Sequence, residues 1–291
     1  MLKISPKHPI NSEISKYQEL QDNELLGAKC TKPIQIERIY TSIMGLVDYS
    51  TLEVLQHFKY GPWEKQTPYS TKIDISPKDE AAANHNNSLA TITSNSTISI
   101  YTDASSMPRQ IGVGSGFVVF QNTPITPIFS DHWNIGDQQL VYNGELDGIT
   151  TAVEYASKIA SPGVHFNIYS DNQAAIYRLQ RISDNPGQSC QVRCIEASNK
   201  IVARGATITI NWVPGHTDVL GNELADALAK DATKLAPYSS ETSFALLGLK
   251  IKQLKTIEWQ ARLKEYKAIA LKSGNPVTYS RIFPWKISSK L

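Results

Sequence analysis

The chain has 291 residues, 41% of them hydrophobic, and its 29 basic and 27 acidic side chains give a formal net charge of +2. This composition excludes wholesale disorder and allows one sizeable core with appendages or two small domains. Three cysteines do not make a disulfide framework, the first residues carry no signal-peptide run, and no apolar run could span a bilayer. We expect an intracellular protein, nuclear or cytoplasmic and not secreted.

The N-terminal segment is predicted to be helical up to about residue 60. Apolar residues between Ile36 and Val47 recur with helical spacing, which predicts a helix over 34–58. Ser50 with Glu53 three positions later has the pattern of a capping box and suggests a second helix start.

The next segment, residues 61–96, contains Pro62, Pro68, Pro77 and a polar run, "NHNNSLATITSNS". Proline and small polar residues interrupt both helices and strands. We predict that this segment is a linker between the helical N-terminal segment (1–60) and a domain that begins at residue 97.

The segment 97–236 alternates between β-rich and helix-like runs. Strands are predicted at 97–102, 112–120, 125–130, 164–170 and 207–213, and helices at 138–160, 171–182, 189–203 and 218–235. The first three strands follow one another without helices, which predicts an antiparallel meander, and the later strands are linked by helices, which predicts parallel pairing. The sequence therefore predicts an α/β fold with a five-stranded mixed sheet flanked by helices.

The C-terminal segment, 237–291, is predicted to be a basic helical extension. It carries net charge +7, whereas 97–236 carries −4 and 1–96 carries −1. A basic segment beside an acidic one suits a nucleic-acid enzyme. A solvated lysine-rich helix explains the same charge equally well.

Four acidic residues stand out in the middle segment. Asp103 and Asp171 follow β-rich runs, whereas Glu145 and Asp226 lie beside the apolar faces of predicted helices. Each alone has an ordinary explanation, such as a turn or helix-cap aspartate or a boundary acid that reaches solvent. A cluster of four carboxylates is unfavourable unless a cation neutralises it, and oxygen ligands without Cys or His favour Mg²⁺ or Mn²⁺ over zinc. The joint pattern predicts two metal ions and phosphodiester hydrolysis.

His216 lies in a glycine-bounded loop, "WVPGHTDVLGNE", shortly before Asp226. A histidine there could move protons, although taken alone a surface histidine explains it better. Cys190 and Cys194 have helical spacing but lack the further ligands of a zinc site, so we expect them to be small core residues.

The segments "IYTDAS", "YNGELDGITTAVEYA", "IYSDNQAAI" and "WVPGHTDVLGNELADALAKDA" together resemble the four signature segments of type 1 ribonuclease H. The resemblance covers about residues 97–236. This segment is most similar to the ribonuclease H domain that follows the reverse transcriptase of fungal non-LTR (LINE-type) retrotransposons. It implies cleavage of the RNA strand of RNA/DNA hybrids, with recognition through 2′-hydroxyl groups rather than base sequence. The N-terminal segment then resembles the end of a reverse-transcriptase region.

The resemblance also assigns roles to individual residues. It implies metal binding by Asp103, Glu145, Asp171 and Asp226, catalysis by these four and His216, and substrate contacts by Ala104, Ser105, Asn172 and Gln173. One departure is Ala104, where glycine is commoner in the family, which implies a slightly weaker fit to substrate. The extra basic helix of some members is missing, so the basic tail is the expected source of phosphate contacts.

Two function classes stay open at the level of sequence. The first is an active hybrid endonuclease that uses two Mg²⁺ ions, or Mn²⁺. The second is a catalytically silent, nucleic-acid-binding relic of a retrotransposon, because a fold does not guarantee an activity. The complete set of acidic residues favours the enzyme, and the "GHTDVLGNELAD" segment argues against another nuclease or a transposase of similar fold.

Overall fold

The computed structural model describes residues 48–61, 63–64, 66–90, 96–121 and 126–272. The described residues up to Leu247 belong to one compact unit, and those from Gly248 onward belong to a second. No helix within these ranges is both long and apolar enough to cross a membrane.

The first unit is built on a six-stranded mixed sheet with the order β1-β6-β5-β2-β3-β4. The strands are β1 (Ser70–Lys72), β2 (Thr97–Ser105), β3 (Gly114–Gln121), β4 (Phe129–Asn134), β5 (His165–Ser170) and β6 (Thr207–Trp212). The neighbours β2, β3 and β4 are antiparallel, whereas β2, β5, β6 and β1 run parallel. Both the predicted meander and the predicted parallel part of the sheet are confirmed.

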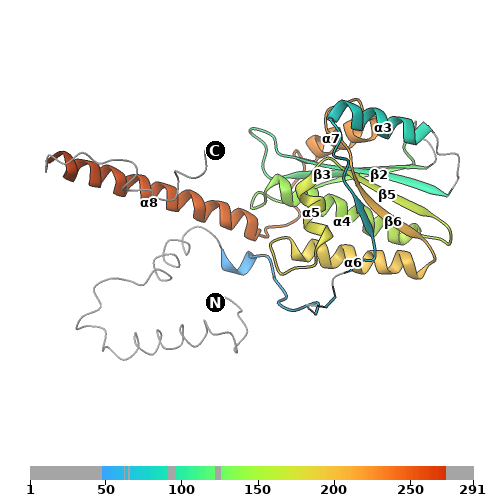
Figure 1. Ribbon diagram of the computed structural model, residues 1–291, viewed down its shortest axis with the longest axis horizontal. Coiled ribbons are helices and arrows are strands. Elements are labelled where there is room, and N and C mark those ends of the chain that lie inside the picture. The colour runs from blue at the N-terminus through green and yellow to red at the C-terminus, as the bar shows by residue number, and fades with distance from the viewer. Residues whose placement is uncertain (1–47, 62, 65, 91–95, 122–125, 273–291) are drawn as a thin grey trace. The chain divides into compact units, whose positions relative to one another are not determined.

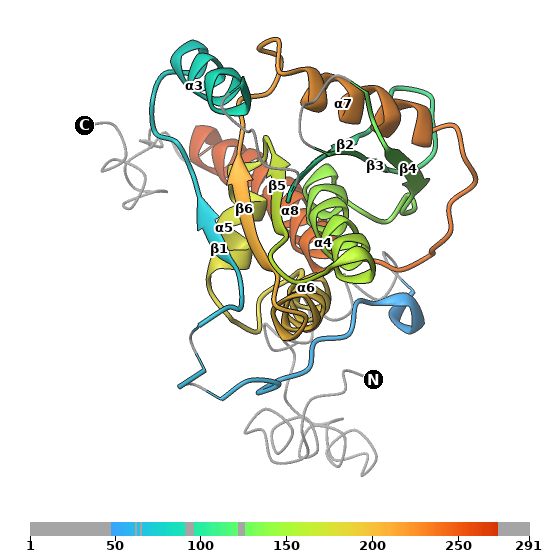
Figure 2. The ribbon, with the colours of Figure 1, turned by 90° about the vertical axis from the view of Figure 1, so that its right-hand side faces the viewer.

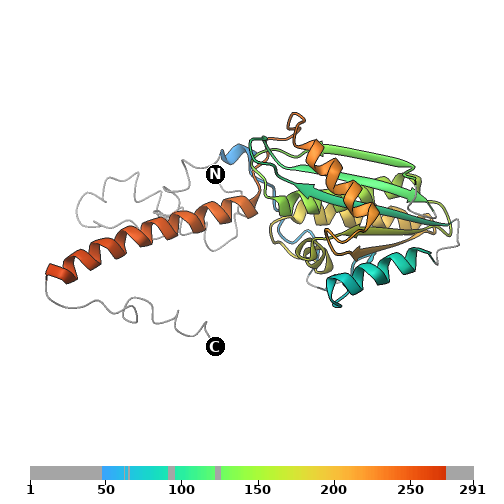
Figure 3. The same ribbon diagram turned by 90° about the horizontal axis from the view of Figure 1, so that it is seen from above.

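Helices cover both faces of this sheet (Figures 1 and 2). They are α3 (Lys78–Ala90), α4 (Val141–Ile159), α5 (Gln173–Gln180), α6 (Gln188–Ala203) and α7 (Leu220–Ala232), together with a short 3₁₀ helix, η2 (Tyr49–Thr51). The helices α4, α5 and α6 lie on one face, and α3 and α7 lie on the other, where Figure 3 shows α7 crossing the strands.

Each face has its own apolar core. The larger core lies under α4, α5 and α6, where the stripe of α4 formed by Leu146, Ile149 and Val153 is fully buried against the sheet. Cys194 is buried in this core and Cys190 packs against it, as expected for small core residues. The smaller core lies under α7 and α3 and is centred on Tyr101 and other aromatic side chains.

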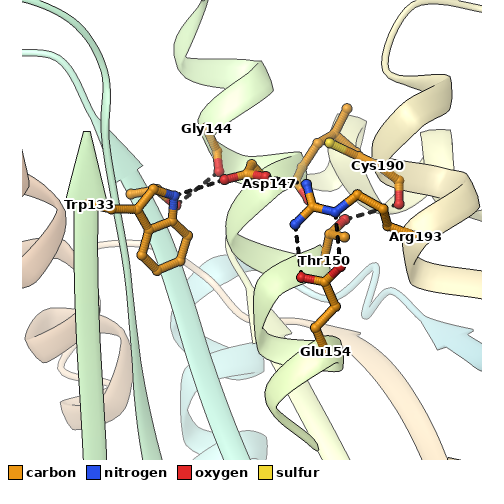
Figure 4. A network of polar contacts seen from close by, with 9 residues as sticks. Trp133, Gly144, Asp147, Thr150, Glu154, Cys190 and Arg193 are labelled. Carbon is orange, nitrogen blue, oxygen red and sulfur yellow. Dashed lines mark hydrogen bonds and ion pairs between the residues drawn. The ribbon is translucent and has the colours of Figure 1, made fainter. Parts of the chain in front are cut away.

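A polar network fixes α4 to its neighbours (Figure 4). Arg193 of α6 makes two hydrogen bonds to Glu154, at 2.9 and 2.8 Å, and one of 2.8 Å to Asp147. The indole nitrogen of Trp133 on β4 donates to the other oxygen of Asp147 at 2.8 Å. Bidentate arginine–carboxylate pairs are geometrically specific, so this network sets the position of α4 along the sheet.

The sixth strand corrects the prediction of five. Strand β1 and helix α3 both lie within 61–96, the segment predicted as a linker. A three-residue strand is too short for an alternating pattern, so the sequence carried no signal for it. The strand is held instead by burial of Tyr69, whose hydroxyl donates to the carbonyl of Leu179 at 2.8 Å, and by pairing with β6.

The helix predicted over 34–58 lies partly outside the described residues, and its described part is not an α-helix. After η2 the described residues up to Gly61 form no helix, and Leu52 forms a bridge with Thr242. Glu53 does not cap a local helix. Its buried carboxylate accepts hydrogen bonds from the backbone nitrogens of Gly187 at 2.7 Å and Phe244 at 3.2 Å, at the starts of α6 and of the C-terminal helix α8 (Phe244–Lys272). A carboxylate at a helix N-terminus satisfies donors that the helix leaves unpaired.

The predicted C-terminal helix corresponds to α8 (Phe244–Lys272). Its first turn belongs to the first unit, where Leu247 is buried. From Gly248 onward, α8 belongs to the second unit and exposes basic side chains that include Lys252, Lys255 and Arg262.

Candidate active site

The parallel pairing of β2 with β5 brings two of the predicted acidic residues to one edge of the sheet. Tyr101 of β2 is in register with Tyr169 of β5, Asp103 follows two positions later in β2, and Asp171 directly follows β5. Ligand sites in α/β proteins favour this carboxyl edge of the strands. Glu145, in the second turn of α4, completes the group from one face of the sheet.

Asp103, Glu145 and Asp171 form a tight group. One carboxylate oxygen from each lies within 4.8 Å of those of the other two. Asp103 and Glu145 are only 5% and 3% exposed, and Asp171 is half-buried. Three carboxylates so close together and so poorly hydrated cannot all stay charged without a neutralising partner.

The pKa values of all three carboxyl groups are raised, as expected for buried acidic groups whose charge is not neutralised. Burial, and then the charge of Asp171, raise the pKa of Asp103 to about 7. Burial, together with the charges of Asp103 and Asp171, also raises the pKa of Glu145 well above its ordinary value. For Asp171, burial raises the pKa and the nearby His216 lowers it. Raised pKa values favour the protonated carboxyl groups, and a divalent cation would favour the ionised ones instead.

The donor set fits a hard cation. Mg²⁺ prefers oxygen ligands and keeps part of its water shell, so a few carboxylates open to solvent on one side suit it. The half-buried Asp171 supplies such an open side. The described residues therefore fit the predicted magnesium or manganese ion.

Hydrogen bonds from neighbouring residues orient the carboxylates of Asp103 and Glu145 and hold the backbone at Asp171. The hydroxyl of Ser170 donates to Glu145 Oε2 at 3.2 Å and accepts from the backbone nitrogen of Asn172 at 3.1 Å. The backbone nitrogen of Ala104 donates to Asp103 Oδ1 at 2.7 Å. The indole of Trp212 donates to the backbone carbonyl of Asp171 at 2.9 Å. Fixed outer partners of this kind hold metal ligands in place.

Two glycines permit the close approach that the site needs. A Cβ atom at Gly144 would lie 2.7 Å from side-chain carbons of Ala104 and Val113, so this glycine lets α4 pack tightly on the sheet beside Glu145. A Cβ atom at Gly215 would lie 2.1 Å from Asp171 Oδ2. The loop after β6 therefore packs its backbone directly against the carboxylate.

Asp226, the fourth predicted metal ligand, belongs to a second group of described residues. It lies with His216 and Glu223, whose ligand atoms are all within 4.8 Å of one another. Asp226 Oδ2 also pairs with Lys230 at 2.5 Å. This second group lies close to the group of Asp103, Glu145 and Asp171, because the charge of Asp226 contributes to the raised pKa values of Asp103 and Asp171.

Glu223 is a member of this second group that sequence reasoning missed. It is exposed in the first turn of α7, three positions before Asp226, so both lie on one helix face. That spacing was the available signal, but exposed glutamates near helix starts are common without any function.

His216 lies in a loop with an unusual backbone. Both His216 and Asp218 have positive φ angles, of 57° and 56°, a conformation that few residues other than glycine adopt. His216 is exposed, as a mobile proton carrier would be, and its charge lowers the pKa of Asp171. Such backbone conformations are typical of functional sites.

The four predicted substrate contacts have different surroundings. Ala104 is buried, Ser105 is half-buried, and Gln173 is exposed at the start of α5. Asn172 caps α5, because its side-chain oxygen accepts from the backbone nitrogen of Ala175 at 3.0 Å. The Cβ of Ala104 lies where it would meet a Cβ at Gly144, so the close packing of these two small residues accompanies the alanine at position 104.

The sequence of this region matches a protein family. The model of the RNase H family matches residues 95–234. These residues are a ribonuclease H domain. The domain contains Asp103, Glu145, Asp171, His216 and Asp226, whereas β1 and α3 lie outside the match.

Two solved structures that are similar to the ribonuclease H domain are distant from it in sequence. The N-terminal RNase H domain of a Mycobacterium tuberculosis protein, solved as a fusion with maltose binding protein, is 20% identical, with a TM-score of 0.39 over 47% of this chain and 93% of that one. RNase H1 from the archaeon Halobacterium salinarum is also 20% identical, with a TM-score of 0.36 over 47% and 96%. A search of curated proteins found no match. The family assignment rests on the sequence match.

Proposed function

We propose that this chain is an endonuclease that hydrolyses the RNA strand of RNA/DNA hybrids with two divalent metal ions. The observation that carries the proposal is the group formed by Asp103, Glu145 and Asp171, three acidic side chains within 4.8 Å inside a ribonuclease H domain. Their raised pKa values support it, because strongly perturbed carboxylates cluster at functional sites.

In this proposal, Asp103, Glu145 and Asp171 hold one Mg²⁺ or Mn²⁺ ion, and Asp226 contributes to a second. The bound ions would activate the attacking water and stabilise the leaving oxygen of the phosphodiester. Ser170 and Trp212 keep Glu145 and Asp171 in place. His216, which lies exposed in its loop, accepts or donates a proton during the reaction.

Substrate binding in this proposal uses the residues around the carboxylates. Asn172 has its side-chain oxygen engaged in the helix cap, which leaves its amide hydrogens for the substrate, and Gln173 is exposed beside it. The backbone around Ala104 and Ser105 would contact the nucleic acid. These groups can bind 2′-hydroxyls and phosphates in the wide minor groove of a hybrid, which distinguishes RNA from DNA without reading bases.

The proposal is tested by cleavage of a labelled RNA strand annealed to DNA. With Mg²⁺ or Mn²⁺, we expect products with 5′-phosphate and 3′-hydroxyl ends, while single-stranded RNA and duplex DNA stay intact. Equal cleavage of single-stranded RNA contradicts the assignment. Hybrid binding without cleavage at any metal concentration favours the second candidate, a nucleic-acid-binding relic, which fits the same basic tail and acidic site.

Gly215→Ala should lower the turnover of hybrids by about 10²-fold, because an added methyl group displaces Asp171 and small misplacements of reacting groups have effects of that size. Initial rates at saturating hybrid measure the effect. Gly248→Ala is the matched control, since the added carbon there has no atom within 4 Å apart from its chain neighbours and the nearby backbone of its own helix. Equal rates for both variants and the wild type would show that the loop does not position Asp171.

The motifs also support two finer proposals about origin and setting. We infer that the ribonuclease H domain derives from a retroelement of the LINE type, because its signature segments are most similar to that variety. We also infer an intracellular location. Both inferences rest on the sequence alone.

A further inference from the structure

The polypeptide before the ribonuclease H domain reaches the edge of the sheet that holds the active site. Strand β1 pairs in parallel with β6, from Ser70 with Thr209 to Lys72 with Asn211. It therefore leaves the sheet at the edge where Asp171 follows β5 and where the loop that carries His216 follows β6. The chain turns after Lys72 and begins α3 at Lys78 on the same side.

Helix α3 is anchored to the strands that carry the catalytic aspartates. His85 Nε2 lies 2.9 Å from the hydroxyl of Tyr101, and the His85 ring packs edge-on against Tyr169 with 4.7 Å between ring centres. These tyrosines precede Asp103 and Asp171 by two positions each. Because His85 contacts both strands, the start of α3 has a fixed place relative to the active site.

Lys78 is the basic residue at that start. Its side chain is exposed, and none of the ion pairs found among the described residues involves it. Helix α3 joins the end of β1, at the active-site edge, to the segment before β2, and Lys78 is its first residue, seven positions before His85. An exposed ammonium group at the edge of the sheet that holds the carboxylates is available to a phosphate of a bound strand.

Two acidic residues, Asp79 and Glu80, follow directly in the first turn of α3. This segment is therefore not a basic patch that would attract any polyanion. The first turn of α3 offers one cation at the active-site edge of the sheet, which suits a single phosphate of a bound strand.

We propose that Lys78 is a substrate-binding residue, supplied from outside the ribonuclease H domain, that contacts a backbone phosphate of the RNA/DNA hybrid next to the cleavage position. The inference rests on the proposed function. It assigns the polypeptide before the domain a part in the active site rather than the role of a spacer. The contact is to the phosphate backbone, so it adds affinity and register without reading base sequence.

Binding of a fluorescent hybrid to the full chain between 50 and 200 mM NaCl tests this inference. All binding is measured with Mg²⁺ in chains that also carry Asp103→Asn, because this substitution prevents cleavage in the proposed mechanism. Lys78→Gln should weaken binding by about 3–10-fold at 0.1 M salt and reduce the log–log salt slope by about 0.9, the value for one lost phosphate contact on duplex DNA. Lys78→Arg should restore most of the affinity and most of the salt slope. In the wild-type background, Lys78→Gln should raise KM by a similar factor with kcat changed less than about 2-fold.

Lys158→Gln is the matched control, because Lys158 is exposed in the last turn of α4, whose other end carries Glu145. If Lys78→Gln gives the same affinity and slope as this control, the phosphate contact is refuted. A lower melting temperature with an unchanged slope points to a structural role and also refutes it.

The two proposals can fail separately. If the wild-type chain binds hybrids but does not cleave them, the proposed enzyme activity fails, whereas the salt slope of Lys78→Gln still decides the contact. If the chain binds no hybrid at all, both proposals are overturned.

Discussion

Asp103→Asn should lower the turnover of RNA/DNA hybrids by about 10³-fold or more. Asp103 belongs to the three-carboxylate group, and its replacement removes a ligand that a metal ion would need. Metal ions stabilise transition states by several kcal/mol, and each 1.4 kcal/mol corresponds to a factor of ten in rate. Single-turnover rates with excess enzyme and Mg²⁺ would measure the loss.

The same variant should be more stable than the wild type in the absence of metal. The folded pKa of Asp103 is raised to about 7, above the unfolded value near 4, so the penalty of its charge is fully present above pH 7 and disappears below about pH 4. A neutral asparagine avoids that penalty, and we expect a gain on the order of 1–3 kcal/mol at pH 7.5 that vanishes near pH 4. Urea unfolding in EDTA at both pH values tests it.

Asp131→Asn is the matched control for both measurements. Asp131 is an exposed strand aspartate whose Oδ1 accepts from the next backbone nitrogen at 2.8 Å, as Asp103 Oδ1 does at 2.7 Å. It should change neither turnover nor stability appreciably. Near-normal cleavage by Asp103→Asn would contradict the proposed metal centre.

Deleting residues 1–94, which leaves the ribonuclease H domain and the tail, should lower the melting temperature by roughly 6–20 °C. The deletion removes Tyr69 from the core and Glu53 from two helix starts, and it exposes Tyr101 where His85 covers it. Removing one large core side chain destabilises a protein by about 3–5 kcal/mol, and each kcal/mol lowers the melting temperature by about 2–4 °C in a domain of this size.

Deleting residues 1–47 is the control, because it keeps β1, α3 and Glu53. Thermal unfolding followed by circular dichroism compares the two chains. Identical melting temperatures would mean that the contacts of β1 and α3 add nothing to the stability of the ribonuclease H domain.

The repeating elements of the sheet and its helices were predictable from the sequence because each buries a regular apolar pattern. The spacing from Leu146 to Ala156 predicted α4, and the fully buried positions of that helix follow it. Two of the predicted metal ligands, Asp103 and Asp171, were recognisable because they follow the apolar parts of two β-rich runs, and parallel strands end at one edge of a sheet. Their proximity is a consequence of topology, which the order of elements already implies.

What the sequence did not predict depends on contacts between distant segments. Strand β1 is held by Tyr69 and by β6, and Glu53 is held by α6 and α8, so neither has a local pattern. The role of Gly215 depends on the approach of Asp171 across a loop, which no periodicity encodes. The grouping of Glu223 with His216 likewise depends on the path of that loop.

The pairing of β1 with β6 has a consequence for how the nascent chain folds during translation. Ser70 and Thr209, whose hydroxyl groups lie 2.9 Å apart, are separated by 139 positions, and the ribosome makes β1 long before its partner. Strand β1 cannot join the sheet until β6 has left the exit tunnel, and closing so long a loop makes this a late and slow step. Until then Tyr69 and the open edge of the sheet stay exposed, and that interval is when a chaperone would be needed most.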